Sequence, residues 1–168
     1  MIIALEGFMG SGKSSVGRVL ADMLGIRFID LDETIVEGEK RPIPEIFSSE
    51  GEKGFRILEL KYLRRLLKGG GEAVLSLGGG TPTISAAASL IREKTICIYL
   101  RASLDTLEAN LSGSESSRPL LEGAPLRERI ASLLSERAET YEECAHATID
   151  IDGLSPEEIA EEIIIGCL

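Results

Sequence analysis

The stretch GFMGSGKSS, residues 7–15, directly follows the apolar segment IIALE at residues 2–6. It fits the pattern G-x-x-x-x-G-K-[ST], whose fixed positions are Gly7, Gly12, Lys13 and Ser14. Behind it, apolar residues recur from Val16 to Leu24 at the spacing of one face of an amphipathic helix, which Gly25 is expected to end. The pattern therefore predicts a loop that joins a strand to a helix.

Such a loop turns backbone N–H groups inward, and the helix start adds its positive dipole end, so a polyphosphate binds there. We expect a nucleotide at the loop residues Gly10, Ser11, Gly12, Lys13, Ser14 and Ser15. Lys13 is expected at the β- and γ-phosphates and the Ser14 hydroxyl at Mg²⁺. The alternative is a glycine-rich turn that only packs a helix on a sheet, and the combined match of spacing and context disfavours it.

Length and composition restrict the functional classes. The chain has 168 residues, enough for one domain with a proper core, and a formal net charge of −10. This acidity argues against a nucleic acid or a membrane surface as partner. With no leader-like or membrane-spanning apolar run, we expect a cytoplasmic protein. We also expect a monomer. Cys97, Cys144 and Cys167 are expected to be reduced thiols that mostly fill the core, and His146 a helix-end or surface residue.

Apolar strand-like runs alternate with helical patterns along the whole chain. We predict strands at residues 2–5, 26–30, 73–77, 95–100 and 147–151, and later helices near 55–68, 84–92, 103–111, 125–144 and 155–166. Ser155, Pro156 and Glu158 supply the N-cap, first residue and capping-box acid of the last helix. This alternation predicts an α/β fold: a three-layer, doubly wound sandwich around a central parallel sheet. The segments 32–61 and 112–125 break the rhythm and are candidates to cover a ligand site.

Acidic residues follow the second predicted strand. Alternation along an extended segment would point the Asp30 and Asp32 carboxylates to one side, where one could hold metal-bound water and the other accept a proton. A helix N-cap with an accompanying surface acid is the alternative. Farther on, Arg56 and Glu59 lie three residues apart on one helical face, either as part of a site or as an exposed ion pair.

Glycines and arginines complete the candidate set. Gly78, Gly79 and Gly80 follow the third predicted strand and suggest a backbone that a ligand approaches closely. Arg118 lies in the segment 112–125 and could neutralise charge on a transferring phosphoryl group, whereas Arg137 on the long helix could clamp a substrate carboxylate. Arg137, like Arg127 and Arg129, could also be a solvated helix charge.

Taken together, GFMGSGKSS, DLD, EGEKGFRILE, LGGGTP, RPLL and ERAETYEECA resemble shikimate kinases in order and approximate spacing, over essentially the whole chain. The resemblance implies ATP-dependent phosphorylation of the 3-hydroxyl of shikimate, on the route to chorismate and the aromatic amino acids. It also implies a P-loop kinase fold with a five-stranded parallel core, an acceptor-binding region near 32–61 and a mobile lid near 112–125.

Site residues follow from the resemblance one by one. Asp32, Arg56, Gly79, Gly80 and Arg137 match shikimate contacts, Gly78 belongs to the same turn, and Glu59 matches the acid that orients the binding arginine. Phe47 and Phe55 match apolar walls of the acceptor pocket. Asp32 is the candidate base, Lys13 and Arg118 stabilise transferred charge, Ser14 and Asp30 hold Mg²⁺, and Pro156 matches a residue beside the adenine.

The sequence departs from the family pattern at AETY, residues 138–141, where a proline usually precedes the tyrosine, and more consequentially at Leu111. Leu111 stands where an adenine-covering arginine is expected, so we expect looser ATP binding and poor discrimination against GTP. Two other functions remain as alternatives. One is another P-loop kinase, acting on gluconate or a nucleoside monophosphate. The other is a nucleotide-dependent switch with no acceptor pocket.

Overall fold

A five-stranded parallel sheet forms the centre of the computed structural model, which describes residues 1–112, 119–123 and 125–168. The strands lie in the order β2-β3-β1-β4-β5. Their bounds are β1 (Ile2–Glu6), β2 (Arg27–Asp30), β3 (Ala73–Ser76), β4 (Ile96–Arg101) and β5 (Ala147–Asp150). Every pairing is parallel, as the alternation of strand and helix patterns predicted.

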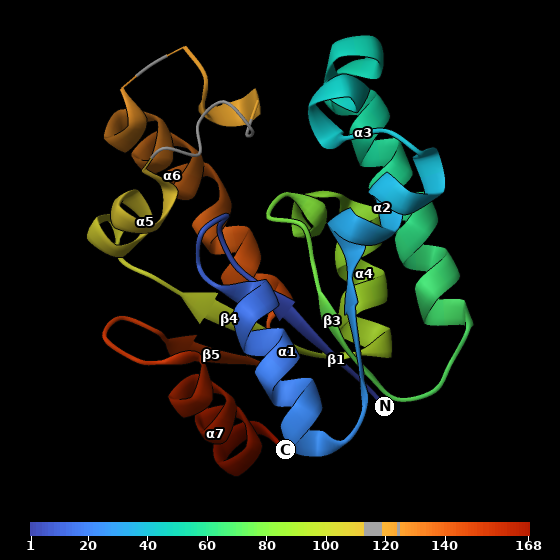
Figure 1. Cartoon of the computed structure of the whole chain (residues 1–168), viewed down its shortest axis with the longest axis vertical. Helices are drawn as coiled ribbons and strands as arrows, with labels where there is room; N and C mark the ends of the chain where they lie inside the picture. The colour runs from blue at the N-terminus through green and yellow to red at the C-terminus, as the bar shows by residue number, and fades with distance from the viewer. Residues whose placement is uncertain (113–118, 124) are drawn as a thin grey trace.

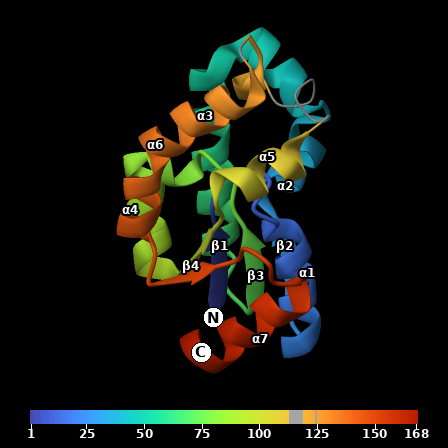
Figure 2. The ribbon, with the colours of Figure 1, turned by 90° about the vertical axis from the view of Figure 1, so that its left-hand side faces the viewer.

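Helices cover both faces of this sheet (Figures 1 and 2). One face carries α1 (Lys13–Leu24) and α7 (Pro156–Cys167), and the other carries α3 (Ile43–Lys68), α4 (Ser85–Lys94) and α6 (Leu126–Cys144). The helices α2 (Leu31–Glu39) and α5 (Leu104–Leu111) lie toward the carboxyl ends of the strands, with the short 3₁₀ turns η1 (Thr81–Thr83) and η3 (Pro119–Leu121). The predicted three-layer α/β sandwich is confirmed.

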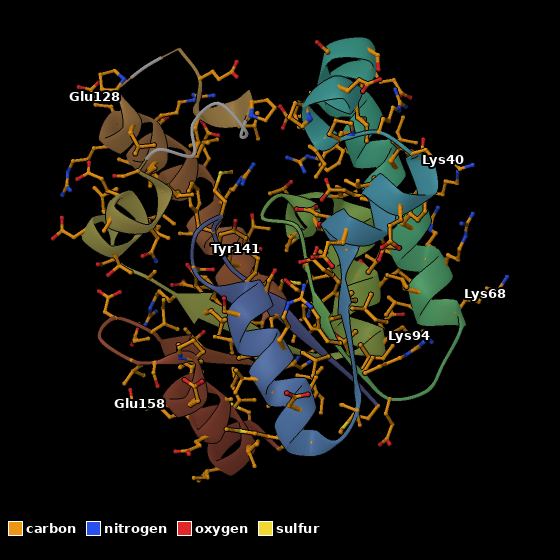
Figure 3. The ribbon with its side chains drawn as sticks, viewed as in Figure 1. Lys40, Lys68, Lys94, Glu128, Tyr141 and Glu158 are labelled. Carbon is orange, nitrogen blue, oxygen red and sulfur yellow. The ribbon has the colours of Figure 1, made fainter. Side chains whose placement is uncertain are left out.

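Strand β1 is buried along its whole length because it lies between β3 and β4 and under helices on both faces. Its side chains alternate between two apolar clusters. Ile3 and Leu5 pack into the cluster that includes α1 and α7, whereas Ile2 and Ala4 pack into the cluster under α3 and α4. Labelled lysines and glutamates extend outward from the helices in Figure 3, while Tyr141 lies inside the molecule.

Two helix boundaries follow the sequence signals closely. Gly25 ends α1 with φ 67°, a left-handed conformation that favours glycine. Ser155 caps α7 by accepting the Glu158 N–H, and the Glu158 side chain accepts the Ser155 N–H in return.

Two local expectations need correction. Helix α3 begins at Ile43 and not near residue 55, and it is interrupted at Gly51, whose φ of 72° and ψ of 179° are not helical. Helix α2 begins at Leu31, immediately after β2, so Asp32 lies in a first helical turn and not in an extended segment. The expected alternation of Asp30 and Asp32 along a strand is therefore wrong.

Candidate active site

The glycine-rich loop wraps around the side chain of Lys13, the first residue of α1. Gly12 takes a left-handed φ of 86°, which lets the chain turn from the loop into the helix. Lys13 Nζ donates hydrogen bonds to the carbonyl oxygens of Gly7 (2.9 Å) and Phe8 (3.0 Å). A cavity of about 620 Å³ lies against this loop, and its lining includes Gly10, Gly12, Lys13, Ser14 and Ser15. Ser11 is buried and does not line the cavity.

Ser14 and Asp30 meet at the edge of this loop cavity. Ser14 Oγ donates to Asp30 Oδ2 at 2.6 Å, and Asp30 Oδ1 accepts the Glu33 N–H at 3.1 Å. The helix N-cap alternative for Asp30 is therefore correct, and the same carboxylate also faces the cavity. A hydroxyl and a carboxylate are hard oxygen donors of the kind that Mg²⁺ accepts beside phosphates, so the residues present fit the ion.

A second cavity, of about 550 Å³, adjoins the first. Its lining includes all the predicted acceptor-site residues: Asp32, Phe47, Phe55, Arg56, Glu59, Gly78, Gly79, Gly80 and Arg137. The rings of Phe47 and Phe55 lie 5.0 Å apart between centroids and form an apolar wall. Asp32, Met9 and Gly79 line both cavities, so the two spaces meet at these residues.

Arg56 is held in the acceptor cavity by a buried carboxylate. Glu59 is completely buried; its Oε1 pairs with Arg56 Nη1, and its Oε2 accepts a hydrogen bond from the Thr81 hydroxyl. Burial opposes the Arg56 charge, but the carboxylates of Glu59 and Glu52 outweigh that effect and raise the pKa of Arg56. The alternative that Arg56 and Glu59 form an exposed surface ion pair is therefore wrong, although Glu52 is largely exposed.

Arg137 enters the same cavity from α6 and is only 5% exposed. Its Nη1 has no hydrogen-bond partner among the described residues, an expensive situation for a buried charged donor. A Cβ added at Gly79 would lie 3.4 Å from this Nη1, so the guanidinium passes close to the glycine backbone. The Tyr141 hydroxyl donates to the Gly79 carbonyl from one turn farther along α6. An anionic ligand group in the cavity would satisfy Arg137.

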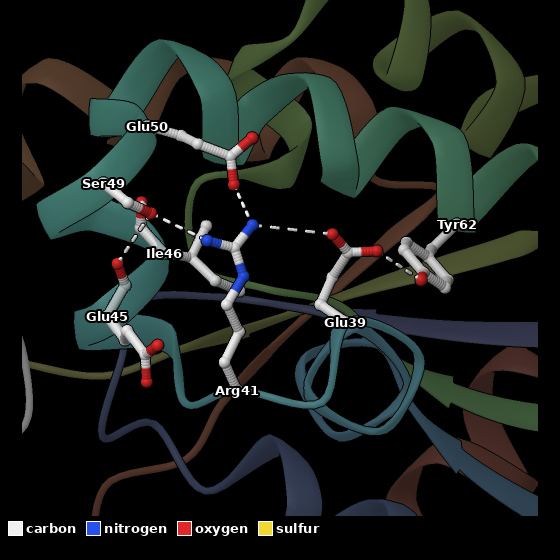
Figure 4. A network of polar contacts seen from close by, with 7 residues as sticks. All are labelled: Glu39, Arg41, Glu45, Ile46, Ser49, Glu50 and Tyr62. Atoms are coloured by element: carbon white, nitrogen blue, oxygen red, sulfur yellow. Dashed lines mark hydrogen bonds and ion pairs between the residues drawn. The ribbon is translucent and has the colours of Figure 1, made fainter.

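A polar network ties the helices around the acceptor cavity together (Figure 4). Arg41, in the turn between α2 and α3, donates to Ser49 Oγ at 2.7 Å and pairs with Glu50 and Glu39. The Tyr62 hydroxyl donates to Glu39 at 2.8 Å, which lowers the pKa of Glu39. The network connects the end of α2 with both halves of α3, on either side of Gly51, and so fixes the segment that carries Phe47 and Phe55.

The structure does not bring every predicted residue to the site. Arg118 and half of the predicted lid, residues 113–118 and 124, lie outside the described residues. Pro156 is the first residue of α7 and lines neither cavity. Leu111 is 1% exposed and packs against Gly10, so its side chain belongs to the core beneath the loop and is not exposed where a base would stack on it.

Several lining residues were not predicted. Met9, Ile43, Pro119 and Leu120 line the acceptor cavity, and Thr81 holds Glu59. Met9 occupies a variable position of the loop pattern, so nothing in that pattern marks it as a residue shared by both cavities. Thr81 directly follows the triple glycine, which was the signal available for it.

Comparison with known proteins identifies the family. Residues 9–167 match the sequence model described as shikimate kinase. This chain belongs to the shikimate kinase family. It is 41% identical to the shikimate kinase of Geobacter metallireducens over 161 residues, covering 96% of this chain and 88% of that protein. It is 40% identical to the enzyme of Enterococcus faecalis, covering 96% of this chain and 95% of that protein.

Solved shikimate kinase structures have the same fold. A shikimate kinase from Acinetobacter baumannii in complex with shikimate superposes with a TM-score of 0.93 at 34% identity, over 97% of this chain and 90% of that one. The shikimate kinase from Aquifex aeolicus gives a TM-score of 0.84 at 34% identity, over 98% and 95% of the two chains. The family, the fold class and the enzyme class predicted from the sequence are confirmed. None of the described helices is long and apolar enough to cross a membrane.

Proposed function

We propose that this shikimate kinase transfers the γ-phosphoryl group of ATP to the 3-hydroxyl of shikimate, giving shikimate 3-phosphate and ADP on the route to chorismate. The observation that carries the proposal is the meeting of the two cavities at Met9, Asp32 and Gly79. One cavity has the donors of a phosphate loop, and the other has two arginines and an acid. Phosphoryl transfer needs little beyond such alignment and charge neutralisation.

The acceptor cavity suits a small hydroxylated carboxylate. Arg137 carries a buried donor with no hydrogen-bond partner among the described residues, and Glu59 orients Arg56, so two planar guanidinium groups are available for one carboxylate. Phe47 and Phe55 offer an apolar wall for a ring. Gly79 and Gly80 leave space where a ring would meet backbone. Gluconate also carries a carboxylate, but its open chain has no ring to pack on this apolar wall, and a nucleoside monophosphate brings a phosphate in place of the carboxylate. Both are therefore less suitable acceptors.

The nucleotide cavity suits a triphosphate with a divalent cation. The carbonyl oxygens of Gly7 and Phe8 hold the Lys13 ammonium group at the loop. When a nucleotide binds, Lys13 would exchange these partners for the β- and γ-phosphates. Ser14 and Asp30 would hold Mg²⁺, Asp30 through water, and the ion when bound neutralises phosphate charge. Arg118 and Pro156 are proposed to act at the transferred phosphate and the adenine, respectively.

Asp32 is proposed as the base. It lies on the first turn of α2 and lines both cavities, so a hydroxyl bound in one cavity and directed at a phosphate in the other would pass it. The hydroxyl proton passes to the Asp32 carboxylate as the new O–P bond forms and ADP leaves with the electron pair of the broken bond.

A coupled assay of ADP release, run with shikimate, gluconate or a nucleoside monophosphate, tests the proposal. We expect release to depend on shikimate, and phosphorus NMR to place the product phosphate on the 3-oxygen. Release stimulated by another acceptor would indicate a different kinase, and slow release independent of any acceptor would indicate a nucleotide switch. Asp32→Asn should lower the single-turnover rate more than it weakens shikimate binding. Loss of binding alone would remove Asp32 from the proton transfer.

The surroundings of the enzyme follow the same proposal. A net charge of −10 disfavours binding to nucleic acid, and the substrates are small molecules. The monomeric state and the cytoplasmic location stay predictions. Size-exclusion chromatography with light scattering would measure the first.

A further inference from the structure

Glu6, Cys97 and Cys144 form a buried cluster, and none of the three lines either cavity. Glu6 is the last residue of β1, Cys97 is on the neighbouring strand β4, and Cys144 is the last residue of α6. Ala4 pairs with Cys97 in the parallel register, so Cys97 and Glu6 project from the same face of the sheet. Cys144 comes down onto that face, and none of the three residues is more than 2% exposed.

The Glu6 carboxyl group is poorly satisfied where it lies. It is completely buried, and neither oxygen has a regular hydrogen bond among the described residues. Burial, with a further contribution from Cys144, raises the pKa of Glu6 to about 9. The thiols of Cys144 and Cys97 interact with it, and they are weak partners for a buried carboxyl group.

The three ligand atoms of this cluster, one carboxylate oxygen and two sulfurs, lie within 4.8 Å of one another. Bonds of about 2.3 Å to sulfur and about 2.0–2.2 Å to oxygen place ligand atoms of a tetrahedral zinc site roughly 3.5–3.8 Å apart. The cluster therefore needs to contract by at most about 1 Å to enclose an ion. Thiolates select soft or borderline cations over Mg²⁺ and Ca²⁺, while a carboxylate fits the divalent ones.

We propose that Glu6, Cys97 and Cys144 form a binding site for a thiophilic divalent cation, Zn²⁺ in particular, that is separate from the Mg²⁺ site of the nucleotide cavity. Binding replaces one carboxyl and two thiol protons, which leave to solvent, by three bonds to the ion. Water or the Ala88 carbonyl, whose oxygen lies 3.9 Å from Cys144 Sγ, completes a fourth position. No redox step and no nucleotide are required.

An entry path exists at the end of α6. Cys144 ends the helix, Ala145 is half-buried, and Glu142, Glu143 and His146 around it are exposed. Backbone hydrogen bonds from Ala145 to Tyr141 and from His146 to Cys97 hold this end, and their transient opening would let an ion reach Cys144. His146 does not offer its Nδ1 as a metal ligand, because this atom accepts the Cys97 N–H at 3.0 Å.

The test is titration of the reduced, metal-free full chain with Co²⁺, a spectroscopic substitute for Zn²⁺, in excess Mg²⁺ that fills oxygen-rich sites. We expect one Co²⁺ per chain, with thiolate-to-cobalt absorption that Zn²⁺ abolishes. Loss of a residue that only hydrogen-bonds a metal ligand typically lowers metal affinity 10- to 100-fold. Because the cluster residues would bind the ion directly, the Co²⁺ affinity should fall by more than this in Glu6→Gln, Cys97→Ala and Cys144→Ala. Cys167→Ala is the matched control, since Cys167 is the cysteine outside the cluster, and it should bind like wild type.

X-ray absorption on the wild-type zinc complex keeps the test decisive even if the variants unfold. Two sulfur neighbours at about 2.3 Å support the site, and a shell of oxygens alone overturns it. Unchanged Co²⁺ affinity in a folded Cys97→Ala or Cys144→Ala variant also overturns it. So does a disulfide between Cys97 and Cys144 in the unreduced, denatured chain, identified by peptide mapping.

Discussion

Replacing Gly80 by alanine should damage shikimate binding selectively. Gly80 has φ −99° and ψ −5°, which alanine also adopts, so the backbone does not require glycine there. A Cβ at this position would, however, lie 2.2 Å from Arg56 Nη2 and 2.3 Å from both Arg56 Cζ and Nη1. The guanidinium rests directly against the glycine, so the new methyl group and Arg56 cannot occupy their present positions together.

The size of the effect follows from the displacement. Non-bonded heavy atoms settle at about 3.5–4.0 Å, so the guanidinium must retreat by about 1 Å or more. Hydrogen bonds of about 2.7–3.2 Å to a bound carboxylate do not survive that shift. Such charged hydrogen bonds contribute about 1.5–3 kcal/mol, so the dissociation constant for shikimate should rise about 10- to 150-fold. ATP binding should change little, because Gly80 does not line the nucleotide cavity.

Calorimetric titration of shikimate and of a non-hydrolysable ATP analogue into Gly80→Ala would measure both effects. Gly166→Ala is the matched control, because no heavy atom lies within 4 Å of a Cβ built there. Circular dichroism should show a folded chain, since the displaced Arg56 keeps the exposed Glu52 as a partner. Wild-type shikimate affinity in folded Gly80→Ala would refute the placement of Arg56 at the acceptor carboxylate.

Three further substitutions probe other parts of the site. Lys13→Ala should lower turnover by about a hundredfold or more, about 3 kcal/mol of barrier, in a chain that remains folded; near-normal steady-state rates would exclude the phosphate role. Arg137→Ala should weaken shikimate far more than ATP in calorimetry, and equal losses would indicate a structural role. Leu111→Arg should lower the thermal midpoint by about 2–4 °C per kcal/mol lost, because residue 111 is buried against Gly10; an unchanged midpoint with tighter ATP binding would contradict this burial.

Local sequence signals predicted the parts of the molecule that depend on neighbours along the chain. The strand-loop-helix start and the caps at Gly25 and Ser155 all follow from short-range patterns. The interrupted start of α3 escaped prediction because Gly51 tolerates a non-helical conformation between two helical stretches. The geometry of Asp30 and Asp32 was misjudged because the first residue after β2 already begins a helix.

Long-range proximity was harder to predict. In the sequence, Glu6 is the end of an apolar strand and Cys97 and Cys144 are interpreted as core residues. Only the pairing of the strands and the position of α6 bring the three together. Spacing along the chain carries no trace of such a cluster. The acceptor site could be predicted mainly because several separate motifs matched one family in order, whereas Met9 had no motif of its own.

The central place of β1 has a consequence for how the enzyme folds. The first strand of the chain pairs with β3 and β4, and with no strand next to it in sequence. The glycine-rich loop therefore follows a strand whose two partner strands lie much later in the sequence, ending at Ser76 and Arg101. Closing such long loops before any contact stabilises them slows folding. During synthesis the glycine-rich loop emerges first, but it cannot take its folded position until β3 and β4 have been made. Nascent chains that end before β4 should therefore not yet retain ATP.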